Sequence, residues 1–427
     1  MRTYYLNKLS PEEIVQLTKR PAVNLEKIIN LVKPILNDIK TNGLKAALEY
    51  SRELDGNDND YILVTKKEFD EAENNLTTDV KSAIITAFNN IEKFHSKQVP
   101  IQYETETMPG IVCSREFRAI ENVGLYIPGG SAVLPSTMLM LGIPAKIAGN
   151  KRIIACSPSR TNKVNLPLLF AAKICGINEF YKIGGAQAIG LMAYGDNNAP
   201  KVNKIFGPGN QYVTAAKMLV SIDPDGCSID MPAGPSEVLV IADSSANPAF
   251  IAADLLSQAE HGADSQVVLI TTTLGMANDI ELELVSQLEQ LPRKSLASKA
   301  LENSFVLITE EINQAIEFSN NYAPEHLILN VKNPEKYVST VVNAGSVFLG
   351  EYSPESAGDY ASGTNHSLPT SGYAKTYGGV SVEAFMKSIT FQKLSKEGLQ
   401  NISGAVQTLA EVEGLQAHKN AVQIRMK

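Results

Sequence analysis

Gln258 and His261 lie three residues apart and are candidates for a shared chemical role. They lie near the end of a segment that begins at Asn247-Pro248, where an N-cap followed by proline predicts the start of a helix. Residues three apart share a helix face, and Asp254 lies a turn earlier on the same side. An amide oxygen and an imidazole nitrogen presented together are suitable ligands for zinc. The pattern equally fits a helix end whose histidine binds the last carbonyls, so both interpretations stay open.

Glu325 and His326 form a second candidate pair. They are adjacent, they follow Pro324, and an apolar run over 327–329 predicts a strand directly after them. A neighbouring carboxylate and imidazole could activate water and accept a proton. Neighbours in a regular strand point to opposite faces, so both reach one site only if the backbone is irregular, which the proline favours. The alternative is a surface glutamate beside a half-buried histidine.

The last part of the chain supplies further polar candidates. A Gly/Ser-rich stretch over 353–366 contains Asp359, which could be a hard-oxygen metal ligand or could form an Asx turn. His366, at its end, could contact a substrate or cap the loop. Glu413 and His418 lie five residues apart in the C-terminal region. Polar loops after buried strands are often functional, so we keep these residues as candidates.

The composition excludes several classes of protein. With 44% hydrophobic and 20% charged residues, the 427-residue chain is typical of globular proteins with two or three domains. The net charge of −8 argues against a nucleic-acid partner. Four irregularly spaced cysteines predict buried thiols in a reducing compartment and no disulfide framework. We expect a cytoplasmic protein without membrane contact, because the sequence has no apolar run of spanning length and no apolar signal region.

Apolar periodicity predicts an α/β fold with two Rossmann-like, doubly wound parallel-sheet domains. Strand patterns alternate with helical patterns from 123 to 220, and a second βαβ unit runs from 238 to 270. The regions 24–97 and 382 onward are expected to be mainly helical, with one strand over 61–64 and with His95 on a solvated surface. The expected divisions are a small helical N-terminal segment (1–22), a first α/β domain on the metal and substrate side (23–127 plus 237–380), a second Rossmann-like domain on the NAD side (128–236) and a C-terminal helical tail (381–427).

Glycine-rich turns follow three of the strands between 123 and 206, at the carboxyl edge where open α/β sheets bind ligands. The standard G-x-G-x-x-G fingerprint is absent, because Tyr212 stands at the third position after Gly207 and Gly209. Three polar side chains would project from this edge toward the ribose or phosphate oxygens of a nucleotide: Tyr126, Gln187 and Asn210. The alternative makes Tyr126 a core aromatic residue and the two amides helix caps.

Taken together, these stretches resemble the histidinol dehydrogenase family. The resemblance is carried by GLYIPGG at 124–130, GGAQA at 184–188, FGPGN at 206–210, DMPAGPS at 230–236, SQAEHG at 257–262, PEH at 324–326, the polar stretch 353–366 and AHKN at 417–420. Motifs of this length in the same order make a chance match very improbable.

The resemblance implies an oxidoreductase that uses zinc and NAD. In the family pattern, one zinc ion is held by Gln258, His261, Asp359 and His418. NAD is contacted by Tyr126, Gln187 and Asn210. Histidinol is contacted by Ser236, His326, Glu413 and the four zinc ligands. By the same analogy, we expect a homodimer in which the C-terminal tail completes the partner's site.

The implied reaction belongs to the last steps of histidine biosynthesis: L-histidinol is oxidised to L-histidine through L-histidinal, in two successive hydride transfers to NAD. Zinc would position the substrate, His326 would accept protons, and Glu325 would activate the water that attacks the aldehyde. One alternative is a zinc hydrolase in which Glu325 activates a metal-bound water. Another is a metal- or nucleotide-binding protein without catalysis. Formation of NADH in the presence of histidinol separates these functions.

Overall fold

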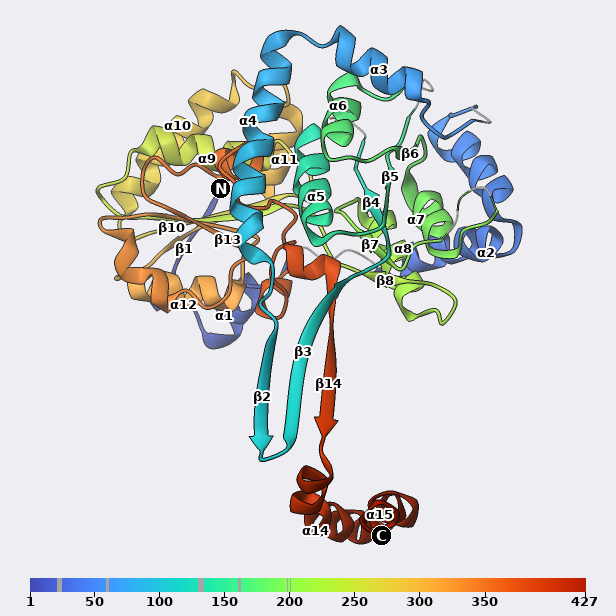
Figure 1. The fold of residues 1–427 in the computed structure, drawn as a ribbon. Coiled ribbons are helices and arrows are strands. Elements are labelled where there is room, and N and C mark those ends of the chain that lie inside the picture. The colour runs from blue at the N-terminus through green and yellow to red at the C-terminus, as the bar shows by residue number, and fades with distance from the viewer. Residues whose placement is uncertain (21–24, 59–60, 130–133, 160–162, 198, 200) are drawn as a thin grey trace.

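The computed structural model describes residues 1–427 except 21–24, 59–60, 130–133, 160–162, 198 and 200, so Gly130 of the first glycine turn lies outside the described residues. Two parallel sheets lie side by side with helices on both faces of each, and a stalk of antiparallel strands projects from this body to a small helical lobe (Figure 1). The predicted α/β class with two doubly wound parallel sheets is confirmed.

The larger sheet has six strands, all parallel. Their order is β1 (Arg2–Tyr5), β11 (Phe305–Ile308), β10 (Gln266–Thr271), β9 (Glu237–Ala242), β12 (His326–Asn330) and β13 (Ser346–Leu349). One face is covered by α9 (Pro248–Ala259), α10 (Leu274–Leu288) and α11 (Lys294–Glu302), and the other by α1 (Pro11–Leu17) and α12 (Ile312–Tyr322). Every residue of β9, β10 and β12 is therefore buried, as expected for a parallel sheet covered on both sides.

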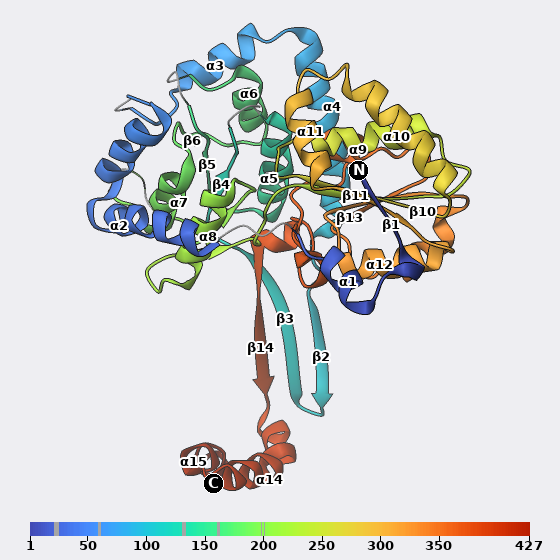
Figure 2. The same cartoon turned by 180° about the vertical axis from the view of Figure 1, so that it is seen from behind.

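The smaller sheet has five parallel strands. Their order is β6 (Glu179–Tyr181), β5 (Arg152–Cys156), β4 (Asn122–Tyr126), β7 (Lys204–Phe206) and β8 (Ser228–Ile229). One face is covered by α3 (Lys66–Asn75), α4 (Thr78–His95), α5 (Pro135–Ala148) and α6 (Leu166–Ile174), and the other by α2 (Leu25–Asp55), α7 (Gly185–Tyr194) and α8 (Gln211–Ile222). Figure 2 shows α7 and α8 beside α2. The strand expected over 61–64 is present only as an isolated bridge between Leu63 and Tyr181.

The packing divides the chain differently from the predicted boundaries. Helices α2, α3 and α4 and strand β4, all within 23–127, belong to the five-stranded sheet and its covering layers, and not to the sheet formed mainly by 237–349. The N-terminal segment is not purely helical either, because Arg2–Tyr5 forms the edge strand β1 beside β11. Helical periodicity shows which face of a helix is buried but not which sheet it covers, and this explains the error.

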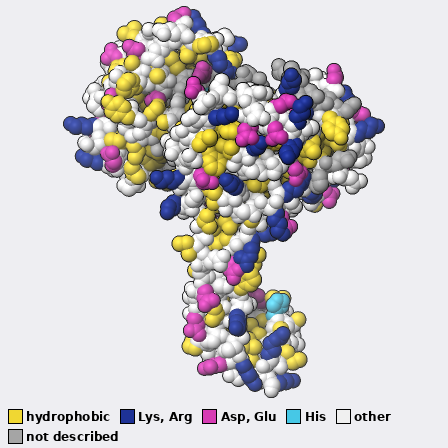
Figure 3. Space-filling model, turned by 45° about the horizontal axis from the view of Figure 1, so that its top comes forward, with side chains coloured by type: hydrophobic (Ala, Val, Ile, Leu, Met, Phe, Trp, Pro, Cys, Tyr) yellow, Lys and Arg dark blue, Asp and Glu magenta, His cyan; other side chains and the backbone are white. Residues whose placement is uncertain are grey.

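The stalk consists of three antiparallel strands, β2 (Tyr103–Met108), β3 (Ile111–Ala119) and β14 (Met386–Leu394). The prediction of a helix through the last of these segments is wrong. Ile389 and Phe391 are two residues apart, which fits strand periodicity, and β14 pairs with β3 along its whole length. Beyond it, α14 (Lys396–Val412) and α15 (Gln416–Gln423) form the lobe. Figure 3 shows hydrophobic side chains along the stalk and on the lobe, which stand clear of the body.

His95 is a further correction. Its side chain is fully buried at the end of α4, where Nδ1 lies 2.9 Å from the Ile91 carbonyl oxygen and Nε2 lies 3.2 Å from the Asn365 amide nitrogen. The same amide donates to the Met140 carbonyl oxygen at 2.6 Å. The charged residues around His95 suggested a solvated surface, but only one face of an amphipathic helix is solvated. His95 in fact ties α4 and α5 to the loop after Asp359.

The expectation that the cysteines form no disulfide framework agrees with the structure. The four cysteines are free thiols, three of them buried and Cys113 partly exposed. A capping box begins α1, where the hydroxyl of Ser10 accepts a hydrogen bond from the Glu13 N–H at 3.3 Å. In the part of the chain that the structure describes, no helix combines the length and the apolar character needed to cross a bilayer.

The base of the stalk offers a test of how the tail is attached. Phe385 is fully buried and stacks on Phe206 of β7, with ring centroids 3.8 Å apart. Alanine would leave a cavity, so we expect Phe385→Ala to lower the free energy of unfolding by about 3–5 kcal/mol in urea titrations. Tyr352→Ala, at a site 85% exposed, is the control and should change it by less than about 0.5 kcal/mol. Equal stability of the two variants would show that this ring does not anchor the stalk.

Candidate active site

A cavity of about 580 Å³ lies between the two parallel sheets. Its walls come from both units. Ser236, Glu325 and His326 stand at the amino ends of β9 and β12, whereas Asn210 follows the carboxyl end of β7. The six-stranded sheet therefore presents its amino edge to the cavity, and the five-stranded sheet presents its carboxyl edge.

This arrangement decides which helix ends reach the cavity. Gln211 and Thr214 line it from the start of α8, and Ser136 lines it from the first turn of α5. Helix α9 runs the other way and presents its last turn, with Gln258. Helix N-termini attract anions and helix C-termini attract cations. One wall of the cavity is therefore suited to phosphate and the other to a positive ion.

The Glu325–His326 pair is held by the first residue of the neighbouring strand. The Glu237 N–H donates to Glu325 Oε2 at 2.9 Å, and the Glu237 carbonyl oxygen lies 3.2 Å from His326 Nδ1. Both side chains of the pair are buried, and they approach to 3.6 Å. The irregular backbone that the sequence required is supplied by Ala323, whose φ of 53° ends α12 in the left-handed region just before Pro324.

Gly345 lets strand β13 approach this dipeptide closely. A Cβ at Gly345 would lie 2.5 Å from the Glu325 carbonyl oxygen. Glycine leaves room there, and the Ser346 N–H donates to that oxygen at 2.9 Å. The catalytic candidates are thus held between β9 on one side and β13 on the other.

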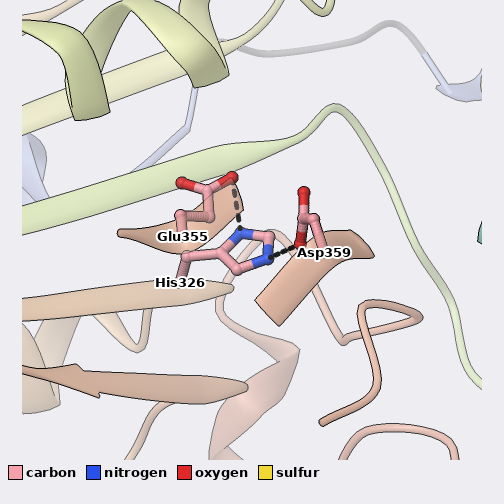
Figure 4. A group of neighbouring side chains, drawn as sticks. All are labelled: His326, Glu355 and Asp359. Atoms are coloured by element: carbon pink, nitrogen blue, oxygen red, sulfur yellow. Dashed lines mark ion pairs between the residues drawn. The ribbon is translucent and has the colours of Figure 1, made fainter. Parts of the chain in front are cut away.

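His326 forms a cluster with Glu355 and Asp359, both on the short helix α13 (Glu355–Tyr360) (Figure 4). His326 Nε2 lies 3.4 Å from Asp359 Oδ1, and His326 Nδ1 lies 3.7 Å from Glu355 Oε1. Among the described residues, the buried atoms His326 Nε2, Glu355 Oε2 and Asp359 Oδ1 have no hydrogen-bond partner. Buried polar atoms without partners are rare, and imidazole and carboxylate are common ligands, so this set fits a bound cation.

Burial and charge together displace the pKa values of the cluster. Burial raises the pKa of Glu325 and of Glu355 to about 8, against the opposing charge of His326. Burial alone would lower the pKa of His326, but the carboxylates of Glu355, Glu325 and Asp359 outweigh it and raise this pKa well above its usual value. Burial by itself would raise the pKa of Asp359, but the hydrogen bond and the charge of His326 keep the pKa of Asp359 below its ordinary value. Displaced pKa values gathered in a cavity are typical of catalytic sites.

Gln258 and His261 reach the same cavity from the end of α9. The Gln258 side chain is buried. Its amide forms hydrogen bonds to two neighbours when the oxygen accepts from the Glu237 N–H at 3.0 Å and the nitrogen donates to Glu355 Oε1. Asp254, a turn earlier, is also buried, which raises its pKa to about 7. His261 lies just beyond the helix, exposed at the cavity rim. The predicted shared face therefore does bring an amide and an imidazole to one site.

Full-length relatives of this chain share about half of its residues. The sequence pattern of the histidinol dehydrogenase family matches residues 18–426. A histidinol dehydrogenase from Bacteroides thetaiotaomicron is 51% identical over 98% of this chain and 97% of its own length. The chloroplastic one from Arabidopsis thaliana is 50% identical over 100% of this chain and 92% of its own length. The crystal structure of histidinol dehydrogenase from Elizabethkingia anophelis matches with a TM-score of 0.96 and 50% identity, covering 100% of this chain and 98% of that one. The chain belongs to the histidinol dehydrogenase family.

Family membership confirms the resemblance used in the sequence analysis. Most of the residues that the histidinol dehydrogenase pattern singled out line the one cavity: Asn210, Ser236, Gln258, His261, Glu325, His326 and Asp359. These residues come from segments that are far apart in the sequence, and only the fold brings them together.

Tyr126 and Gln187 are not among the described residues that line the cavity. Tyr126 is buried in the core, where its hydroxyl oxygen accepts a hydrogen bond from the Gly185 N–H at 3.1 Å. Gln187 is buried in α7 and donates to Asp55 Oδ2 at 2.7 Å. Asn210 does line the cavity, and its side-chain oxygen caps the first turn of α8. In the structure, Tyr126 is thus a core aromatic residue and Asn210 is a helix cap, which is the alternative that the sequence had left open for these two residues.

Glu413 and His418 lie far from the cavity of their own chain. Both are exposed on the lobe at the far end of the stalk, one after α14 and the other in α15 (Figure 1). The expected zinc set of Gln258, His261, Asp359 and His418 therefore does not assemble within one chain. The sequence left open whether the tail serves its own chain or another, and in the structure the lobe stands away from the cavity of its own chain.

Glu355 was not among the residues predicted from the sequence. It precedes Asp359 by four residues, a spacing that puts both on one face of α13, but the Gly/Ser-rich composition indicated a loop. The same stretch ends at His366, for which two roles were open. His366 lies 2.8 Å from the Asp359 carbonyl oxygen through Nδ1 and 3.1 Å from Thr137 Oγ1 through Nε2. It therefore links the loop of one wall to helix α5 of the other.

Asp359 offers a test of the cation site. Asp359→Asn keeps an oxygen donor but removes the negative charge, so we expect the affinity for zinc to fall by about tenfold or more, measured by metal analysis after dialysis against buffered zinc. Glu351→Gln, at an exposed carboxylate nearby, is the control and should retain the zinc of the wild type. Undiminished zinc in Asp359→Asn would place the metal elsewhere.

Proposed function

We propose that this chain oxidises L-histidinol to L-histidine through L-histidinal, with NAD as the hydride acceptor in both steps. The observation that carries the proposal is the cavity, in which the Glu325–His326 pair and the adjoining donor cluster lie opposite a wall of helix N-termini. Oxidation of an alcohol to an acid needs a proton acceptor and an activated water beside the hydride acceptor. The two walls supply groups suited to each requirement.

NAD is proposed to bind on the wall formed by the five-stranded sheet. The first turns of α5 and α8 present N–H groups and positive dipole ends there, which suits a pyrophosphate. Gly207 has a φ of 120°, and a Cβ at this position would collide with the Tyr126 carbonyl oxygen, so only glycine lets this turn pass close to β4. We propose Asn210, Tyr126 and Gln187 as the contacting side chains, with Tyr126 and Gln187 leaving their present partners on binding.

Zinc is proposed to be held by Gln258, His261 and Asp359 together with His418 of the partner subunit. When bound, the metal supplies positive charge that anchors the imidazole and amine of the substrate and offsets the carboxylates around His326. The buried Asp359 Oδ1 atom, which lacks a hydrogen-bond partner, supports this proposal, because a cation would satisfy it. The side chains of this chain then have two tasks, which are to orient the carbinol carbon and to move protons.

His326 is proposed to accept the hydroxyl proton as the first hydride leaves the carbinol carbon, which yields the aldehyde. Glu325 takes a proton from the water that adds to the aldehyde, and its raised pKa of about 8 makes its carboxylate a stronger base than an ordinary one. After His326 has released its first proton, it accepts another as the hydrate loses the second hydride and becomes the acid. A single cavity can keep the reactive aldehyde bound between these steps.

The tail is proposed to complete the site of a second copy of the chain. The stalk and lobe carry exposed apolar side chains, such as Phe391 at 45% and Leu409 at 61% exposure. Apolar surface on elements that stand clear of the body is typical of an interface between subunits. In a homodimer, the lobe of one subunit would bring Glu413 and His418 to the cavity of the other. There they would contact histidinol together with Ser236.

Glu325→Gln separates the two oxidation steps. Glutamine is nearly isosteric but cannot take a proton from water, so we expect the first oxidation to continue and the second to stall. The wild type should form two NADH per histidinol consumed, and the variant about one, with release of histidinal. The measurement is NADH absorbance combined with product analysis. Equal loss of both steps would contradict the role of Glu325.

Two controls accompany this variant. His326→Ala should slow both steps by about 10²-fold or more, because His326 is proposed to accept a proton in each. The wild type is assayed in parallel, with histidinol and with histidinal as substrates. If the wild type forms no NADH, the proposed function is wrong and a zinc hydrolase becomes the better interpretation.

Mixed dimers test whether the tail acts on the partner. Asp359→Asn damages the cavity and His418→Asn damages the lobe, so each homodimer should be inactive. In a heterodimer with exchanged tails, one site collects both lesions and the other is intact, and we expect about half of the wild-type turnover per dimer. Co-expression with two different affinity tags isolates the heterodimer for this assay. An inactive heterodimer would contradict tail exchange.

A further inference from the structure

The first residue of β9, Glu237, contacts the catalytic pair with its backbone and with its side chain. Its N–H donates to Glu325 Oε2 at 2.9 Å, and its carbonyl oxygen lies 3.2 Å from His326 Nδ1. Its side-chain Oε1 accepts from the Glu325 N–H at 3.2 Å. The Glu237 side chain is only 2% exposed, so it lies in the interior with little water to balance its charge. The placement of Glu325 and His326 thus depends on where this carboxylate is held.

Arg20 holds that carboxylate from the opposite side. Its Nε and Nη2 atoms donate to Glu237 Oε2 and Oε1, each at 2.7 Å. A two-point bond between a guanidinium and a carboxylate fixes the plane of the carboxylate as well as its position. Arg20 belongs to the N-terminal segment that follows α1, for which the sequence analysis found no role in the site.

The remaining N–H groups of Arg20 bind the backbone that leads into the pair. Nη1 donates to the carbonyl oxygens of Tyr322 at 2.7 Å and Thr18 at 2.9 Å, and Nη2 donates to that of Ala323 at 3.2 Å. The guanidinium also lies 3.4 Å from the centre of the Tyr322 ring. Ala323 has a φ of 53°, a left-handed conformation that is unfavourable for a residue other than glycine. Arg20 therefore stabilises the unfavourable turn that aims Glu325 and His326.

Arg20 also lines the cavity, which raises the question of whether it binds substrate. A guanidinium has five N–H donors. The bonds to Glu237, Thr18, Tyr322 and Ala323 use all of them. A substrate could be bound by Arg20 only at the expense of these contacts, so the geometry favours a role through Glu237 and the backbone.

We propose that Arg20 is a positioning residue for Glu325 and His326, which it orients through Glu237 and through the carbonyls of Tyr322 and Ala323. This inference rests on the proposed function, because it assigns Arg20 to the same two-step oxidation. Without the guanidinium, the Glu237 carboxylate would lie buried beside Glu325 with its main counter-charge lost. A displacement of the reacting groups by about 1 Å can cost about 10²-fold in rate.

The test compares Arg20→Ala and Arg20→Lys with Lys19→Ala, an exposed neighbouring cation, in the full-length protein. We expect Arg20→Ala to lower kcat for histidinol oxidation by about 10²-fold, with the KM for histidinol and the zinc content close to wild type. Arg20→Lys keeps the charge but cannot span two carboxylate oxygens and the carbonyls, so kcat should still fall by about tenfold or more. Lys19→Ala should match the wild type.

A wild-type kcat in a folded Arg20→Ala variant would overturn the proposal, and so would a loss of kcat that only follows a loss of zinc. If Arg20→Ala does not fold, Arg20→Lys decides. A wild-type kcat in that variant overturns the positioning role, and a reduced kcat with unchanged KM and zinc supports it. The wild type assayed in parallel distinguishes a failure of the proposed function from a failure of the positioning role. Failure of the wild type to form NADH refutes the proposed function, whereas unaffected Arg20 variants refute only the positioning role.

Discussion

The opposed orientation of the two parallel sheets is the constraint on which the site depends. Helices begin at the carboxyl edge of a parallel sheet and end at its amino edge. Because the five-stranded sheet turns its carboxyl edge to the cavity and the six-stranded sheet its amino edge, helix N-termini line one wall and the end of α9 lines the other. The cavity has a volume of about 580 Å³, and its two walls therefore differ in electrostatic character. An anionic dinucleotide and a cation can be bound face to face, with a small substrate between them.

The amino edge of the larger sheet also concentrates buried acidic groups. Glu237, Glu325 and Glu355 are all buried there, and Arg20 and His326 are the cations that contact them. Buried carboxylates are unfavourable unless they are paired. Arg20 balances the charge of Glu237 with two hydrogen bonds, whereas Glu325 and Glu355 share one ion-pair partner, the imidazole of His326. Burial above all, and to a lesser degree the neighbouring carboxylates, raises the pKa of Glu325 and Glu355 to about 8. A cluster of this kind is suited to accepting protons and positive charge.

Much of this architecture could be predicted because the signals are local. Periodicity and caps indicated β9, α9 and β12 to within a few residues, and helix spacing directed Gln258 and His261 to one cavity. The errors have a common origin. The segment 386–394 is a strand because β3 lies beside it, and the helices of 23–127 cover the five-stranded sheet because their apolar faces fit it. The strand conformation and the choice of sheet both depend on segments distant in the sequence, and local periodicity carries no information about such segments.

By itself the sequence determined the family, the types of residue available for chemistry and most of the individual elements, because long motifs and hydrophobic periodicity are written along the chain. Packing in three dimensions brings Glu355 and Arg20 to the site, buries Tyr126 and Gln187 in the core, and leaves His418 far from the cavity of its own chain. The physical reason is that ion pairs and hydrogen bonds act over a few ångströms in space. Which residues come that close is set by how the sheets and the stalk pack against one another.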